Sequence, residues 1–218
     1  MHETLRQEIL AGVEPGSPLR LSVIAKRLGV STMPVRWALV RLEREGLVRT
    51  IARKGAVVAP LELEDFQEIQ AIRWGIEGLA ARLGAVAVTD EDLDAMRQHL
   101  GDIRTAAGAG DLDAYLSATY ALEDTCYAAA GRPRLLAEVR HHRRAAQRYI
   151  RFVMGNDPSS LVVGPSEAFY EAAAARDGAE AECCLQHEID RLFVRLAGRM
   201  AGATSTSTST STGKERTG

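Results

Sequence analysis

"GVSTMPVRWALVRLEREGLVRTIARKGAVVAP" (residues 29–60) changes its hydrophobic period part-way along, from that of a helix to that of paired strands. Ser31 can cap a helix that carries Pro34 in its first turn, where the missing N–H costs little. The apolar residues of this helix recur at helical spacing: Val35, Leu39, Val40 and Leu42. After Gly46 apolar and polar residues alternate on both sides of a Lys54-Gly55 turn, which predicts a β-hairpin.

Two further short helices are expected before this stretch. Leu5, Ile9 and Leu10 give one amphipathic helix, and the segment 21–28 gives another that ends at Gly29. Three short helices followed by a hairpin predict a winged helix-turn-helix domain over residues 1–60. In that fold the start of the third helix enters the major groove of DNA.

The expected DNA contacts follow from this geometry. Ser31, Thr32 and Arg36 lie on the exposed start of the third helix, where hydroxyls and a guanidinium can reach phosphates and base edges. Arg53 and Lys54 occupy the tip of the wing. The alternative is a solvated helical face that touches no ligand.

The charge distribution favours the DNA-binding interpretation. Residues 1–60 hold ten Lys/Arg and five Asp/Glu, a net charge of +5, whereas residues 61–218 carry −7. A basic module joined to an acidic one indicates that the first part meets a polyanion. The N-terminal "MHETLRQEIL" has no apolar signal stretch and no apolar run is long enough to span a bilayer, so we expect a cytoplasmic protein without a membrane partner.

From residue 61 the pattern is almost purely helical. Six amphipathic segments separated by Gly- and Pro-containing breaks predict an all-α antiparallel bundle over residues 61–202. The segment 203–218 is dominated by Ser and Thr and is expected to be a disordered tail. The fold class is therefore mainly α.

The sequence resembles GntR-family transcriptional regulators of the FadR-like branch, which carry an FCD-type effector domain. The stretch 29–60 is similar to that family's segment from recognition helix through wing, and "IRWGIEGLAARLGA", "AAAGRPRLL" and "AAAARDGAEAE" are similar to segments of its effector domain. The resemblance implies a homodimer that binds an inverted-repeat operator, acts as a repressor and responds to a small metabolite, with a carboxylate as the expected class. It places DNA contacts on Ser31, Thr32, Arg36, Lys54 and Gly55. Thr32 and Trp37 depart from the common pattern, so base preference is expected to differ.

The resemblance also implies an effector pocket. Many FCD domains hold a divalent metal with an Asp and three His, and the corresponding positions here are Thr119, Glu123, Ser166 and Glu188. Since none is histidine, we favour a metal-free pocket that binds its effector by hydrogen bonds, without a cofactor. A hard cation on Glu123, Glu188 and His187 is the alternative. Three arginines are candidate partners for a carboxylate: Arg73, Arg144 and Arg148.

Two other classes of protein compete with this interpretation. An enzyme with a DNA-binding appendage would need a nucleophile or metal motif, and the sequence contains no G-x-S-x-G, H-E-x-x-H, P-loop or G-x-G-x-x-G pattern. A thiol- or metal-responsive sensor would use Cys126, Cys183 or Cys184, but adjacent cysteines diverge on a helix. We therefore expect a DNA-binding regulator and not an enzyme.

Overall fold

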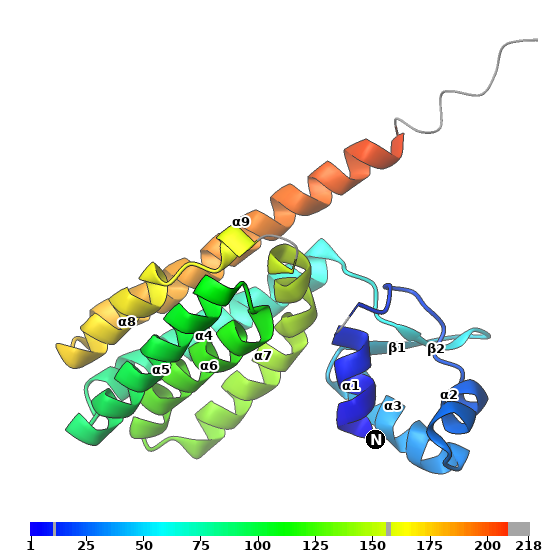
Figure 1. The fold of residues 1–218 in the computed structure, drawn as a ribbon, viewed down its shortest axis with the longest axis horizontal. Coiled ribbons are helices and arrows are strands. Elements are labelled where there is room, and N and C mark those ends of the chain that lie inside the picture. The colour runs from blue at the N-terminus through cyan, green and yellow to red at the C-terminus, as the bar shows by residue number, and fades with distance from the viewer. Residues whose placement is uncertain (11, 156–157, 209–218) are drawn as a thin grey trace, which may run out of the picture.

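The computed structural model describes residues 1–10, 12–155 and 158–208. An N-terminal domain with three helices and one hairpin stands beside a helical domain (Figure 1). The elements of the first domain are α1 (His2–Leu10), α2 (Leu21–Leu28), α3 (Thr32–Arg44), β1 (Val48–Ile51) and β2 (Gly55–Val58). Those of the second are α4 (Leu63–Ala85), α5 (Asp90–Ala109), α6 (Leu112–Ala129), α7 (Pro133–Met154), a 3-10 turn (Pro158–Ser160), α8 (Gly164–Ala174) and α9 (Gly178–Thr208). The predicted winged helix-turn-helix followed by an all-α bundle is confirmed.

The N-terminal domain forms because three short amphipathic helices share one small core. Leu5, Ile24, Val35 and Leu42 are buried together, and Val48 and Val58 of the hairpin close the cluster. The strands pair antiparallel from Val48 opposite Val58 to Ile51 opposite Gly55. Val40, which the sequence pattern assigned to the buried stripe of α3, is 39% exposed, and Ala38 is buried instead.

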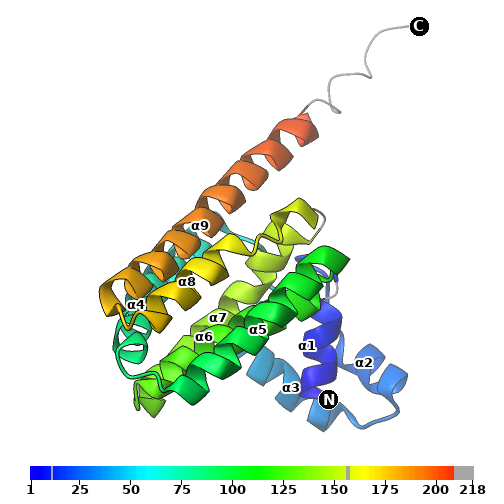
Figure 2. The same cartoon turned by 60° about the vertical axis from the view of Figure 1, so that its left-hand side comes forward.

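The helical domain is organised around α4 and its neighbours. α4 packs along α9, α7 and α6, while α5 packs against α6 and α8 (Figure 2). α5 begins with a capping box, in which the Thr89 side chain accepts from Asp92 N and the Asp92 carboxylate accepts from Thr89 N. Within the described residues no helix is both long and apolar enough to cross a membrane.

The C-terminal boundary differs from the expected one. α9 continues to Thr208, into the segment 203–218 that the composition assigned to a disordered tail. Extending an existing helix costs far less than nucleating a new one, so its last turns can continue through residues of modest helix propensity. The rest of the expected tail, 209–218, lies outside the described residues.

Two sets of hydrogen bonds connect the N-terminal domain and the linker after it to α7. Arg6 on α1 donates to the amide oxygen of Gln147 on α7. On the linker side, Arg148 donates to the carbonyl oxygens of Ala59 and Pro60 and to the Asp65 carboxylate. α7 therefore contacts both the first helix of the N-terminal domain and the segment that follows its wing.

Candidate DNA-binding and effector sites

The start of α3 is exposed along one face. Ser31 stands at the N-cap position but its side chain makes no capping hydrogen bond, so the hydroxyl remains available to a ligand. Thr32 and Arg36 are exposed, as the sequence predicts. Met33 is 53% exposed and Trp37 is 67% exposed on the same helix. A helix that leaves large apolar side chains in water next to an arginine presents a surface suited to a partner.

The wing brings its own cations to the surface. Arg53, Lys54 and Gly55 are all exposed at the turn between β1 and β2. Arg53 has φ 66°, a left-handed conformation that is uncommon for a residue with a side chain, and Gly55 has φ 79°. The tight turn thus projects two basic side chains from the hairpin.

A groove of about 290 Å³ joins the helix to the wing. Arg36 lines it from α3, and Lys54 and Gly55 line it from the hairpin. Arg20, at the start of α2, lines the same groove and was not among the predicted contacts. Ser31, Thr32 and Arg53 are exposed but do not line it. Three of the predicted contacts therefore share one concave surface.

Three cations of the recognition helix and the wing have no acidic partner among the described residues. Arg27 pairs with Glu8 at 2.6 Å and Arg49 pairs with Glu62 at 2.9 Å. By contrast, Arg36, Arg53 and Lys54 form no ion pair within the described part of the chain. A duplex can therefore take these charges as partners without breaking an internal contact.

Four of the predicted effector-pocket residues do meet. Thr119 and Glu123 on α6, Ser166 on α8 and Glu188 on α9 line one cavity. Its volume is about 20 Å³, enough for roughly one water molecule. The Thr119 hydroxyl donates to the Tyr115 carbonyl oxygen at 2.9 Å. The four positions that the family resemblance implied are thus neighbours in space, but the cavity between them is small.

Of the two carboxyl groups of this cluster, that of Glu123 belongs to a buried charged network. Glu77, fully buried, accepts from Arg73 Nε at 2.6 Å and from Arg143 Nε at 2.9 Å. Arg143 also donates to Glu123. Burial is the largest cause that raises the pKa of Glu123 to about 7, with Arg143 opposing it. Burial likewise raises the pKa of Glu188.

The arginines expected at this pocket lie elsewhere. Arg73 is held by Glu77 and by Gln70 Oε1 at 2.8 Å, and Arg148 binds the interdomain linker, so neither lines the small cavity. The sequence shows an arginine on a long helix but not the direction in which it points. Arg144 lines a different, larger cavity between α1, α6 and α7.

The donor set does not fit the metal that the family resemblance implies. The four positions supply two hydroxyls and two carboxyls with raised pKa, one of them bound by Arg143, and no imidazole. His187 is exposed and lies with its Nδ1 3.5 Å from Cys183 Sγ instead. Across the described residues no three His, Cys, Asp or Glu side chains form a group able to hold a metal.

The comparison with known families agrees with this architecture. Residues 2–58 match the bacterial regulatory proteins of the gntR family, and residues 68–191 match the FCD domain. The chain belongs to the GntR family. It is a member of the branch whose second domain is an FCD domain, and the two matched regions correspond to the winged helix domain and the helical bundle.

Individual GntR relatives are similar over part of their length. A regulator from Agrobacterium vitis, encoded in the TAR-I ttuE-ttuC' intergenic region, is 31% identical over 133 residues, 59% of this chain and 78% of that protein. The transcriptional repressor RspR of Escherichia coli K12 is 29% identical over 114 residues, 52% of this chain. The aligned segment spans only half the length of RspR (50%).

The fold of a solved GntR-type structure covers almost the whole chain. E. coli McbR/YncC superimposes with a TM-score of 0.78 over 91% of this chain and 96% of that chain, at 21% identity. At this identity the likeness concerns the fold. The likeness extends over both domains.

Proposed function

We propose that the protein is a transcriptional repressor that binds an inverted-repeat operator as a homodimer and responds to a small metabolite. The observation that carries this proposal is the surface formed by α3 and the wing, where Arg36 and Lys54 line one groove without ion-pair partners among the described residues. Membership of the GntR family supports DNA as the ligand of that surface. The repressor name of RspR supports the direction of regulation.

The dimer follows from the geometry of the target. A winged helix inserts one recognition helix into one half-site, so a twofold protein dimer presents two helices to an inverted repeat. Large apolar side chains remain exposed on the helical domain, including Ile72 and Trp74 of α4, each 43% exposed, and Val194 of α9, 69% exposed. They offer apolar area for a contact between two copies.

The test begins with duplexes selected from a random pool by the purified protein. We expect an inverted repeat, bound by one dimer per duplex in sedimentation velocity, and weak binding to a single half-site. Arg36→Ala should weaken binding to the selected site by about 1–3 kcal/mol and relax its base preference. Arg134→Ala, which removes an exposed charge from α7, is the matched control and should leave binding unchanged.

Two results would refute the proposal. Selection that returns no preferred sequence would exclude an operator, and unchanged binding by Arg36→Ala would remove α3 from the interface. A monomer bound to the full repeat would overturn the dimer alone. Repression is tested separately, with a reporter gene placed behind the selected site.

A thiol-responsive regulator is the second candidate, because one cysteine stands next to a histidine. Cys183 is exposed with its Sγ 3.5 Å from His187 Nδ1, a proximity that the sequence analysis did not anticipate although the two are one helical turn apart. Alkylation of the protein would change operator affinity if this candidate is right. Cys183→Ser should then abolish the effect of alkylation.

A further inference from the structure

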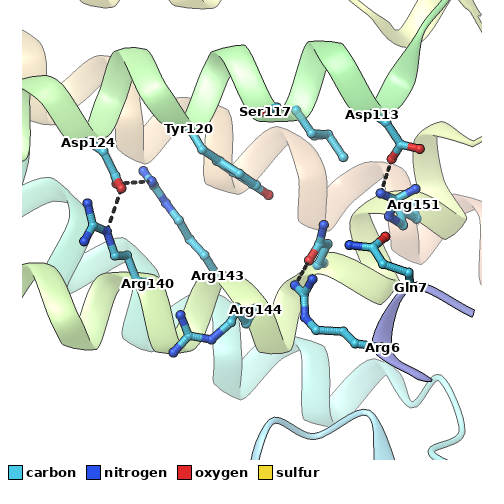
Figure 3. Close-up of a pocket in the computed structure, with 12 residues that line it drawn as sticks. Arg6, Gln7, Asp113, Ser117, Tyr120, Asp124, Arg140, Arg143, Arg144 and Arg151 are labelled. Carbon is cyan, nitrogen blue, oxygen red and sulfur yellow. Dashed lines mark hydrogen bonds and ion pairs between the residues drawn. The ribbon is translucent and has the colours of Figure 1, made fainter. Parts of the chain in front are cut away.

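A cavity of about 510 Å³ lies between the two domains, where α1 approaches α6 and α7 (Figure 3). α1 contributes Arg6 and Gln7 to its lining, and the remaining residues come from the FCD domain. Ligand pockets for small molecules usually measure about 300–1,000 Å³. This cavity has the size of such a pocket, whereas the cluster around Thr119 and Glu188 has a volume of about 20 Å³.

The lining of the interdomain cavity is strongly basic. Five arginines and two aspartates face it: Arg6, Arg140, Arg143, Arg144, Arg151, Asp113 and Asp124. Residues 140, 144, 147 and 151 follow one face of α7, so the basic groups are spread over about 16 Å of helix axis. The cavity therefore presents a row of cations and not a single charged point.

Two donors in this row have no partner among the described residues. Arg144 makes no hydrogen bond or ion pair with any described residue. The Nε atom of Arg151 is buried without a hydrogen-bond partner among the same residues, whereas the Nε atom of Arg6 lies 3.7 Å from the Glu45 carboxylate. A buried donor that lacks a partner costs free energy, and an anion that accepts from it removes this cost.

Tyr120 supplies a further unpaired donor. Its hydroxyl is buried, has no hydrogen-bond partner within the described chain, and points into the space between α6 and α7 (Figure 3). Its ring lies 5.0 Å from the guanidinium of Arg143, which Glu77 holds from the other side at 2.9 Å. These contacts fix the ring, so the hydroxyl is held in place before any ligand arrives.

We propose that this cavity binds an elongated small organic dianion, with Arg144, the Tyr120 hydroxyl and the Nε group of Arg151 as its donors. Carboxylate and phosphate groups are both suited to these donors, because a guanidinium binds either one with paired hydrogen bonds. The proposal rests on the proposed function, because it names the binding site and the chemical class of that regulator's effector.

Binding here would act on the DNA-binding domain directly. Arg6 belongs to α1, whose Leu5, Ile9 and Leu10 are part of the core of the winged helix domain. A dianion that sits between the positive charge of Arg6 and the arginines of α7 attracts both domains and favours one relative position. Operator affinity and dianion affinity are then linked reciprocally.

The experiment uses the full chain and two dianionic probes, adipate and glycerol 3-phosphate, with neutral adipamide as the control ligand. We expect calorimetry to show saturable binding of at least one dianion and none of adipamide. Arg144→Gln and Tyr120→Phe should each weaken that binding at least tenfold, because each removes a proposed donor. Neither substitution breaks a hydrogen bond or ion pair with a described residue, so the fold should be preserved. Arg134→Gln, an equal change of charge outside the cavity on α7, should leave it unchanged.

The outcomes separate this proposal from its rivals. Adipate binding alone would identify carboxylates, and glycerol 3-phosphate binding alone would identify phosphates. No binding of either probe, or equal losses in Arg144→Gln and Arg134→Gln, would overturn the site. Loss of binding in Ser166→Ala but not in Tyr120→Phe would move the effector to the small cluster.

Operator binding is measured on the same samples with and without the dianion. If the wild-type protein binds its operator but binds neither probe, the dianion site fails and the proposed function stands. If a probe binds as expected but no DNA is bound, the proposed function fails instead. If both bind without influencing each other, the link between the domains is refuted.

Discussion

Gly84 shows how closely two helices of the FCD domain approach. A Cβ added at this position of α4 would overlap the backbone carbonyl of Cys126 on α6, which cannot move away as a flexible side chain could. Gly84→Ala should therefore lower the free energy of unfolding by about 2–4 kcal/mol, as an overpacked core does. Urea unfolding followed by circular dichroism measures the change.

Gly101 provides the control. It lies within α5, and a Cβ there would meet no atom within 4 Å. Gly101→Ala should raise the free energy of unfolding by about 0.5–1 kcal/mol, because alanine is the better helix former. Equal effects from the two substitutions would contradict the close packing of α4 on α6.

Glu123 links stability to pH through its burial. The pKa of its carboxyl is raised from 4.5 to about 7 in the folded state. As pH rises, the unfolded state therefore releases this proton at a lower pH than the folded state does. The stability that this proton provides is complete below about pH 4.5 and is lost as pH rises through 7. Between pH 5 and 8 the free energy of unfolding should therefore fall by about 1–3 kcal/mol less in Glu123→Gln than in the wild type.

The comparison with the variant is needed because other groups titrate in the same range. The pKa of Glu188 is also raised, whereas burial lowers the pKa of His142, which gives the opposite slope. Urea unfolding of both proteins at several pH values isolates the contribution of Glu123. Identical slopes for wild type and Glu123→Gln would show that the carboxyl is ionised throughout.

At the scale of the elements, α7 connects the bundle to the linker that follows the wing. The Tyr149 hydroxyl donates to Asp65 of α4 and accepts from Glu62 N at 3.4 Å and from Arg148 at 2.8 Å. Tyr149→Phe should lower the free energy of unfolding by about 1–2 kcal/mol through loss of these bonds. Hydrogen exchange should become faster in the linker, residues 59–66.

A matched tyrosine on α6 separates the hydroxyl from the ring. Tyr127 is as deeply buried as Tyr149, but its hydroxyl has no hydrogen-bond partner among the described residues. Tyr127→Phe should therefore leave stability unchanged or raise it slightly, with no change of exchange in the linker. A loss as large as that of Tyr149→Phe would disprove the assigned role of the linker bonds.

The helices and the hairpin could be predicted because their signals are local. Thr89 and Asp92 fix the start of α5, Pro133 begins α7, and Gly29 ends α2 in a left-handed conformation. The side-chain directions could not be predicted in the same way. Arg148 turns toward the linker because carbonyl oxygens remain there to accept its hydrogen bonds, a fact of tertiary packing.

Local sequence patterns could likewise identify some residues of the candidate sites but not others. Ser31, Thr32, Arg36, Arg53 and Lys54 could be chosen from the order of helix, turn and hairpin, whereas Gly55 was implied by the family resemblance. Trp37 carried a usable signal, since apolar residues at 33, 37 and 40 form a second stripe that the small core of the domain has no room to bury. No sequence signal indicated the interdomain cavity, because Arg6 and Gln147 are 141 residues apart and meet only in the folded chain.

For the whole molecule, the dependence of DNA binding on salt tests the wing. Lys54 is an unpaired cation that we expect on a phosphate, so Lys54→Ala should weaken binding evenly across duplex sequences and lower the slope of log affinity against log salt by about 1. Fluorescence anisotropy at several salt concentrations measures both quantities. Arg134→Ala serves as the control, and an unchanged slope for Lys54→Ala would remove the wing from the interface.

The two domains stand side by side with charges of opposite sign, +5 in residues 1–60 and −7 in residues 61–218 (Figure 1). This separation gives the molecule an electric dipole moment. In the field of a duplex the dipole turns the protein during diffusion, so that the winged helix faces the DNA before contact and the acidic bundle faces away. Productive collisions become more frequent, and the association rate constant should fall as added salt screens the field.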